Sequence, residues 1–193
     1  MTIMLPADPP YSMSVRVITS KNQLSPAFGG ADQELLRKGS RYELAFDHGE
    51  MDYIDALDWS DLMVEGETAV APVFQPGLDT GAPGAPVVSG AGQAGRTLLM
   101  RGVSPGYLIR KGQFLSIISN GQRFLYRAAS AVTALPNGTV SVLLYTLLRR
   151  PHPDGAVVEL AQPMVEGFLR EVSDLTVIAN HDVKVAFKIR ERE

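Results

Sequence analysis

Three glycines in "PVVSGAGQAGRTLLMRG", residues 86–102, have the G-x-G-x-x-G spacing of loops that bind dinucleotides. Gly90, Gly92 and Gly95 would turn the chain tightly between a strand and a helix whose N-terminus holds a pyrophosphate. The residues that follow contradict such a helix, because glycine and proline are poor helix formers. They stand at Gly102, Pro105, Gly106 and Gly112.

The second requirement of this chemistry is an acidic residue about 20 positions further on, which binds the ribose hydroxyls. No acidic residue occurs between Asp79 and Asp154. We therefore interpret the three glycines as a hinge that leads into a strand, and we expect no nucleotide cofactor.

Carboxylates gather in "GEMDYIDALDWSDLMVEG", residues 49–66, where Asp52, Asp55 and Asp58 invite a metal or acid–base interpretation. Apolar residues recur there near a 3.6-residue period, which predicts an amphipathic helix. These are Met51, Ile54, Leu57 and Leu62. Carboxylates that radiate around a helix do not converge on an ion, so we expect a solvated acidic face.

Other catalytic and metal-binding patterns are weak. The histidines His48, His152 and His181 are scattered, and no pair has metal-ligand spacing. The chain has no cysteine and no G-x-S-x-G nucleophile motif. We expect no enzyme, no cofactor and no metal. A hydrolase that uses two N-terminal carboxylates stays open as a remote alternative.

Charge is strongly segregated along the 193 residues, although the net charge is only −3. Residues 1–79 carry 13 acidic and 5 basic residues, and residues 80–153 carry 8 basic residues and no acidic one. Such asymmetry is typical of a nucleic-acid surface or of a complementary protein surface. The bases are spread thinly and the pI is about 5.6, so we favour an acidic protein surface and expect no nucleic acid.

The first part of the chain predicts strands over residues 12–20 and 40–46, joined through a turn around residues 27–33. Residues 71–95 are dense in glycine and proline, and we interpret them as an irregular linker and a domain boundary. We expect Trp59 to be a half-buried anchor of the helix.

Beyond the linker, five strand-length apolar runs alternate with turn sequences over residues 89–165. The five runs are "TLLMRG", "FLSII", "QRFLYRAASAVTA", "TVSVLLYTLL" and "AVVELA". This spacing is typical of a small β-barrel or sandwich. Residues 182–193 alternate apolar and charged residues and predict an amphipathic strand.

The N-terminal residues contain neither a basic segment nor an apolar run of signal-peptide length. No window reaches the roughly 18 to 20 apolar residues of a membrane span. We therefore expect synthesis in the cytoplasm and no membrane partner.

The order of these features resembles that of the distal tail proteins of long-tailed bacteriophages and phage-like particles. The resemblance covers roughly residues 14–193. It rests on "LSPAFGGADQELLRKGSRYEL", "ALDWSDLMVEG", "PVVSGAGQAGRTLLMRGVSPGYLIRKGQFLSI", "GQRFLYRAASAVTALPNGTVSVLLYTLLR" and "VVELAQPMVEGFL". None of these stretches is a catalytic signature.

The resemblance implies a mainly β protein with two domains. Residues 1–85 with 166–193 would form a β-rich ring domain with one helix, and residues 86–165 a small OB-like β-barrel. It also implies a structural protein of the virion tail. The chain would form a ring, expected to be a hexamer, between the tail tube protein and the tail hub protein.

A ring that closes through head-to-tail contacts joins two different surfaces of each copy. We therefore expect the basic and acidic segments to meet between subunits. The interface residues we name are Arg96, Arg101, Arg110 and Lys111 on one side, and Asp52, Asp55 and Asp58 on the other. The alternative class is a carbohydrate- or cell-surface-binding β module.

Overall fold

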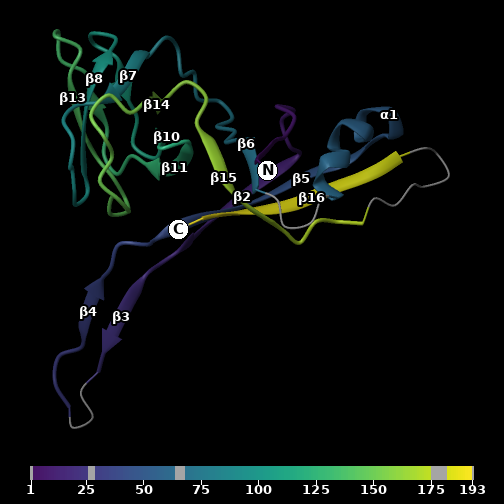
Figure 1. The fold of residues 1–193 in the computed structure, drawn as a ribbon, viewed down its shortest axis with the longest axis horizontal. Helices are drawn as coiled ribbons and strands as arrows, with labels where there is room; N and C mark the ends of the chain where they lie inside the picture. Colours follow the sequence, from purple (N-terminus) through teal and green to yellow (C-terminus); the bar gives the residue numbers. More distant parts are fainter. Residues whose placement is uncertain (1, 26–28, 64–67, 175–181, 193) are drawn as a thin grey trace.

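The fold is mainly β, which confirms the predicted class, with one short α-helix and a curled, half-barrel-like large sheet. It is described by a computed structural model that covers residues 2–25, 29–63, 68–174 and 182–192. Figure 1 shows a small barrel, a set of long strands and a projecting hairpin. No helix within the described ranges is long and apolar enough to cross a membrane.

A six-stranded sheet carries the longest strands, in the order β1-β6-β15-β16-β5-β2. Its members are β1 (Thr2–Met4), β2 (Ser12–Ile18), β5 (Arg41–Asp52), β6 (Thr68–Pro72), β15 (Met164–Arg170) and β16 (Asp182–Glu191). Only β1 and β6 are parallel. Strands β2, β5 and β16 confirm the strands predicted in these regions. Alternate residues of β16 are buried, so one face of the sheet forms the core.

The barrel is built from two three-stranded antiparallel sheets. One contains β7 (Gly84–Val88), β8 (Thr97–Val103) and β13 (Val140–Leu143), and the other β10 (Phe114–Ser119), β11 (Gln122–Arg127) and β14 (Val158–Glu159). Bridges between Ala128 and Leu144 and between Val87 and Val157 join the two sheets into a ring of strands. A small ribbon of β9 (Leu108–Ile109) and β12 (Val132–Thr133) completes this region.

The prediction that residues 71–95 are an irregular linker is wrong for β6 and β7. Of the glycines that suggested irregular chain, Gly84 instead allows close strand contact. A Cβ on Gly84 of β7 would lie 2.7 Å from the carbonyl oxygen of Gly102 on β8. Gly90, Gly92 and Gly95 do form a loop with positive φ angles that leads into β8, as predicted.

The predicted helix over residues 49–66 is wrong in its first part and in its buried face. Strand β5 continues to Asp52, because β16 pairs with it along this stretch. Helix α1 (Tyr53–Ala56) and the 3-10 helix η1 (Leu57–Met63) follow. Ile54 is 77% exposed and Leu57 50% exposed. The buried residues are Ala56, Trp59 and Leu62. Trp59 is buried more deeply than predicted, at 2% exposed.

Strands β3 (Lys21–Leu24) and β4 (Gln33–Leu36) form a hairpin that projects from the large sheet (Figure 1). The turn predicted around residues 27–33 lies at its tip, partly outside the described residues. At its base, the amide of Arg37 donates to the carbonyl of Ser20 at 2.9 Å.

The barrel and the large sheet share side chains. Phe114 of β10 and Leu125 of β11 pack into the core of the large sheet, and the Phe114 ring meets the Tyr42 ring edge-on at 5.9 Å. The predicted domain limits after residues 85 and 165 fall inside β7 and β15. These domain limits stay a prediction. The two parts share core side chains, so packing does not mark a boundary between them.

Candidate functional site

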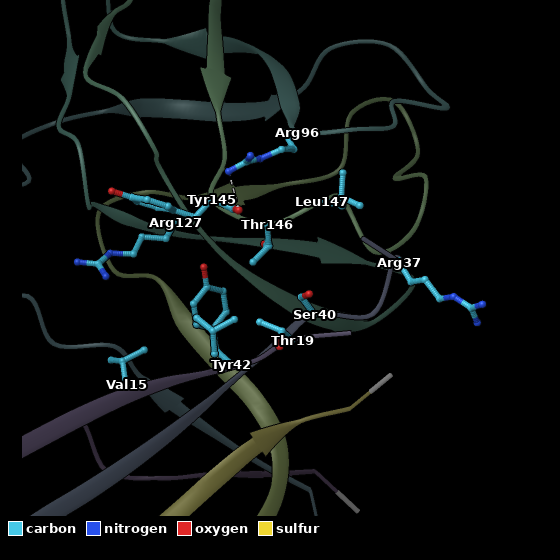
Figure 2. A pocket seen from close by; sticks show the side chains of 11 residues that line it. Val15, Thr19, Arg37, Ser40, Tyr42, Arg96, Arg127, Tyr145, Thr146 and Leu147 are labelled. Carbon is cyan, nitrogen blue, oxygen red and sulfur yellow. Dashed lines mark hydrogen bonds between the residues drawn. The ribbon is translucent and has the colours of Figure 1, made fainter. Parts of the chain in front are cut away.

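A pocket of about 370 Å³ lies between the large sheet and the barrel. We call it the junction pocket. Its wall on the sheet side comes from β2, β5 and the link between β4 and β5. Its wall on the barrel side comes from the residue before β8, the end of β11 and the segment after β13 (Figure 2). It is lined by Val15, Val17, Thr19, Arg37, Ser40, Tyr42, Arg96, Arg127, Tyr145, Thr146 and Leu147.

Strand register explains why these side chains share one face. Val17 is paired with Tyr42, and Val15 with Leu44, so the odd residues of β2 continue the core face of β5. Leu44 is fully buried, whereas Val17 is 41% exposed. The core face therefore stays partly uncovered beneath the edge strand β2.

Two buried hydroxyls line this pocket, Tyr42 Oη and Thr146 Oγ1. In the described part of the chain, neither has a hydrogen-bond partner other than the neighbouring hydroxyl. Tyr42 is 1% exposed, and Figure 2 shows its hydroxyl directed toward Thr146. Burial raises the pKa of Tyr42 to about 12, and the neighbouring Thr146 side chain opposes this rise in part. Buried polar groups normally have partners, so these hydroxyls mark a place that can accept a polar group.

Three arginines surround the pocket, and no acidic side chain is among its lining residues. Arg96 donates to the carbonyls of Leu144 at 3.0 Å and Tyr145 at 2.8 Å. Arg127 donates to the Gly112 carbonyl at 2.8 Å and lies over the Tyr145 ring.

Figure 2 shows the guanidinium groups of Arg37 and Arg127 turned outward on opposite sides of the mouth. Within the described residues, the Arg37 side chain has no ion-pair partner. The rim of the pocket is thus positively charged and suits an anionic group attached to an apolar body.

Behind the pocket, a buried ion pair ties the last strand to the barrel. Glu191 of β16, 1% exposed, pairs with Arg149. Its carboxylate also accepts the amides of Tyr42 and Leu125, both at 2.7 Å. Burial raises the pKa of Glu191, whereas Arg149 and the two amides favour the ionised carboxylate. The three donors come from the large sheet and the barrel, so this carboxylate fixes their relative position.

A second buried carboxylate acts in the same way. Glu166 of β15 is 2% exposed, accepts the amide of Arg123 at 2.9 Å and pairs with Arg192. Arg123 also pairs with Glu159 at 3.3 Å. Several charged side chains at the junction therefore pair with one another.

The structure separates the predicted basic interface residues. Of the four, only Arg96 lines the junction pocket. Arg101 of β8 pairs with Asp154 in the same chain, whose carboxylate also accepts the Gly90 amide at 2.7 Å. Arg110 and Lys111 lie together in the exposed turn between β9 and β10.

The predicted acidic residues do lie close to one another. Asp52 ends β5, Asp55 lies in α1 and Asp58 in η1, and all three are exposed. None of them forms an ion pair within the described residues. No predicted acidic residue meets a predicted basic one inside this chain, so their contact between subunits stays a prediction.

The two histidines among the described residues pack against aromatic rings. His48 packs against Trp59 in a tilted arrangement, with ring centroids 4.1 Å apart. The ring of His152 is buried, and its Nε2 lies 3.1 Å from the Tyr126 hydroxyl. His181 lies outside the described residues. Among the described residues, no three metal-binding side chains converge.

Exposed aromatic side chains bear on the carbohydrate-binding alternative, because such a site needs several in one patch. The more exposed ones are Tyr11, Tyr53, Tyr145 and Phe168. They lie before β2, on α1, after β13 and on β15, and therefore on separate elements.

Sequence reasoning missed the residues that define the junction. Glu191 had a usable signal, since it follows Val183, Val185, Phe187 and Ile189 on the same face of one strand. A carboxylate on the apolar face of a strand needs a buried partner. Nothing local in the sequence signals Tyr42 or Thr146, because their positions depend on the packing of the barrel on the sheet.

The chain was compared with protein-family models and with curated proteins, and neither comparison found a match.

Proposed function

We propose that the chain is a structural subunit that assembles head to tail into a closed ring at the distal end of a phage-type tail. In this role it joins the tail tube to the tail hub. The resemblance described above supplies the location, and features of the molecule support a role in assembly.

The projecting β3–β4 hairpin is the observation that carries the proposal. An isolated two-stranded hairpin is at best marginally stable in water. Here the register places Leu24 and Leu35 on the same face of the ribbon, and both side chains are more than half exposed. An arm with exposed leucines gains stability when another protein covers it.

The edge strand β2 supports assembly as well. Among the described residues it pairs only with β5, and it leads directly into the hairpin. A free edge strand offers unpaired backbone groups to a second chain. The hairpin and this edge thus form one continuous exposed region.

Imaging of the assembled species by negative-stain electron microscopy tests the proposal. We expect rings with a central opening and a uniform number of subunits. A preparation that contains only compact single subunits or irregular clusters, at low and at moderate salt, contradicts ring assembly.

A further inference from the structure

A second exposed feature lies at the other end of the long strand β5. Residues 52–58, which we call the acidic knob, comprise the end of β5, helix α1 and the start of η1. Ile54 is the most exposed of its apolar residues, and Tyr53 and Leu57 are about half exposed. Exposed carboxylates flank them on both sides.

Buried side chains anchor the acidic knob to the large sheet. Ala56 and Trp59 are buried in the core of the large sheet, and the Trp59 ring packs against Phe187 at 5.7 Å. The exposed apolar side chains therefore sit on a fixed base, which lowers the entropy cost of docking.

The knob and the junction pocket cannot meet within one chain. Tyr42, in the pocket, stands near the start of β5, and the knob begins where β5 ends at Asp52. At about 3.3 Å per residue, the strand separates the two features by roughly 30 Å. Figure 1 shows α1 at one end of the long strands and the β3–β4 hairpin at the other.

The two features are complementary in charge and in apolar character. The pocket offers exposed Val17 and an arginine-rich rim without acidic lining residues. The knob offers exposed Ile54 and Leu57 between exposed carboxylates. Apolar contact contributes affinity, while the charges select partner and register.

We propose that the acidic knob of one copy docks in the junction pocket of a second copy. The apolar side chains of the knob enter beneath β2, and Asp55 and Asp58 face Arg37, Arg96 and Arg127. This contact joins two different surfaces of the same chain, so it propagates head to tail. The proposal rests on the proposed function, because it names the contact through which the ring closes.

Cysteine cross-linking tests the contact directly, since the chain has no cysteine of its own. One copy carries Ile54→Cys and the other Val17→Cys. Under mild oxidation we expect a disulfide-linked dimer that forms about tenfold faster than with a control pair of Ile54→Cys and Leu135→Cys. Leu135 is also exposed but lies outside the pocket lining. Equal rates for both pairs overturn the proposal.

A mixing experiment separates this proposal from ring assembly in general. The knob variant carries the neutral substitutions Ile54→Asn, Asp55→Asn and Asp58→Asn, and the pocket variant carries Val17→Glu and Arg37→Glu, all at exposed positions. We expect each variant alone to stay monomeric. Their mixture forms one-to-one dimers, because only one intact knob and one intact pocket remain.

The possible failures are distinguishable by mass. If both variants assemble like the wild type, this contact is wrong and ring assembly stands. If the variants and their mixture are all monomeric while the wild type assembles, the pairing of knob with pocket is wrong. If the wild type is monomeric and the cysteine pairs react equally, both proposals fail.

Discussion

Glu191 is the central charged residue of the junction between the large sheet and the barrel. Its carboxylate holds the Arg149 guanidinium, which is itself 5% exposed. Glu191→Gln leaves that guanidinium buried without a counter-charge, and we expect the free energy of unfolding to fall by about 3 to 5 kcal/mol. Urea unfolding measures this loss. The control Glu171→Gln breaks an exposed pair with Lys188 and should leave stability nearly unchanged; equal effects of the two substitutions would contradict the account.

His152 makes stability depend on pH. Burial, followed by the nearby Arg149 and Arg150 guanidinium groups, lowers its pKa to about 4. The unfolded chain binds a proton there near pH 6.5. Between about pH 6.5 and 4, the unfolded state thus binds more protons, so stability falls as the pH falls and levels off below about pH 4.

The whole contribution of His152 is about 3 kcal/mol. His152→Gln should remove this part of the difference in unfolding free energy between pH 7 and pH 4.5. His48, whose pKa is also lowered, chiefly by burial, provides the control His48→Gln, which retains the His152 contribution. Parallel pH profiles for the wild type and His152→Gln would show that the ring titrates normally.

The sequence predicted the individual residues of the site less completely than it predicted the strands. It found the acidic residues of the knob and Arg96 from charge alone, because charge is legible in the sequence. It missed Tyr42 and Thr146, which become neighbours only when residues about 100 positions apart pack together. It also passed over Glu191, although the alternation of its strand placed this carboxylate on the apolar face.

At the scale of elements, the close pairing of strand β15 with β16 depends on one glycine. A Cβ on Gly167 would lie 2.0 Å from the carbonyl oxygen of Arg190 on β16, where only backbone can yield. Gly167→Ala should therefore destabilise the large sheet by about 3 kcal/mol. The control Gly106→Ala has a positive φ but open space and should cost about 1 kcal/mol. Thermal unfolding of both variants checks the order, and an equal or reversed order would contradict the close approach.

The β3–β4 hairpin should serve assembly rather than folding. Because the amide of Arg37 already contacts the carbonyl of Ser20, residues 21–36 can be replaced by Asn-Gly, a dipeptide suited to a tight hairpin turn. We expect a folded subunit with nearly unchanged stability that assembles poorly. The measurement is urea unfolding together with particle mass. Loss of folding, or full assembly without the arm, would contradict the assigned role.

At the scale of elements, local patterns predicted the longer strands β2, β5, β8, β10, β11, β13 and β16. They missed β1, β3, β4 and β15, and they failed at residues 49–66 and 71–95. In the first segment the helical period was real but short, and pairing with β16 kept its beginning extended. In the second, glycine and proline suggested irregular chain. There Gly84 instead permits the close contact of β7 with β8.

For the whole molecule, folding pairs Arg101, Arg123 and Arg149 with carboxylates of the same chain. Only part of the charge segregation along the chain therefore persists in space. The arginine-rimmed pocket and the acidic knob lie at opposite ends of β5. Two pockets or two knobs repel each other through like charges, whereas the pocket of one copy attracts the knob of another. This arrangement favours head-to-tail contact. Salt should therefore weaken association, since the facing charges lie at an exposed rim.

The absolute mass of the wild-type protein, measured by light scattering at low and at high salt, tests the central claim most directly. The account predicts a closed species of about six copies at low salt, whose population falls as salt screens the rim charges. A protein that keeps the mass of one chain, 20.9 kDa, at every concentration and salt level would contradict it.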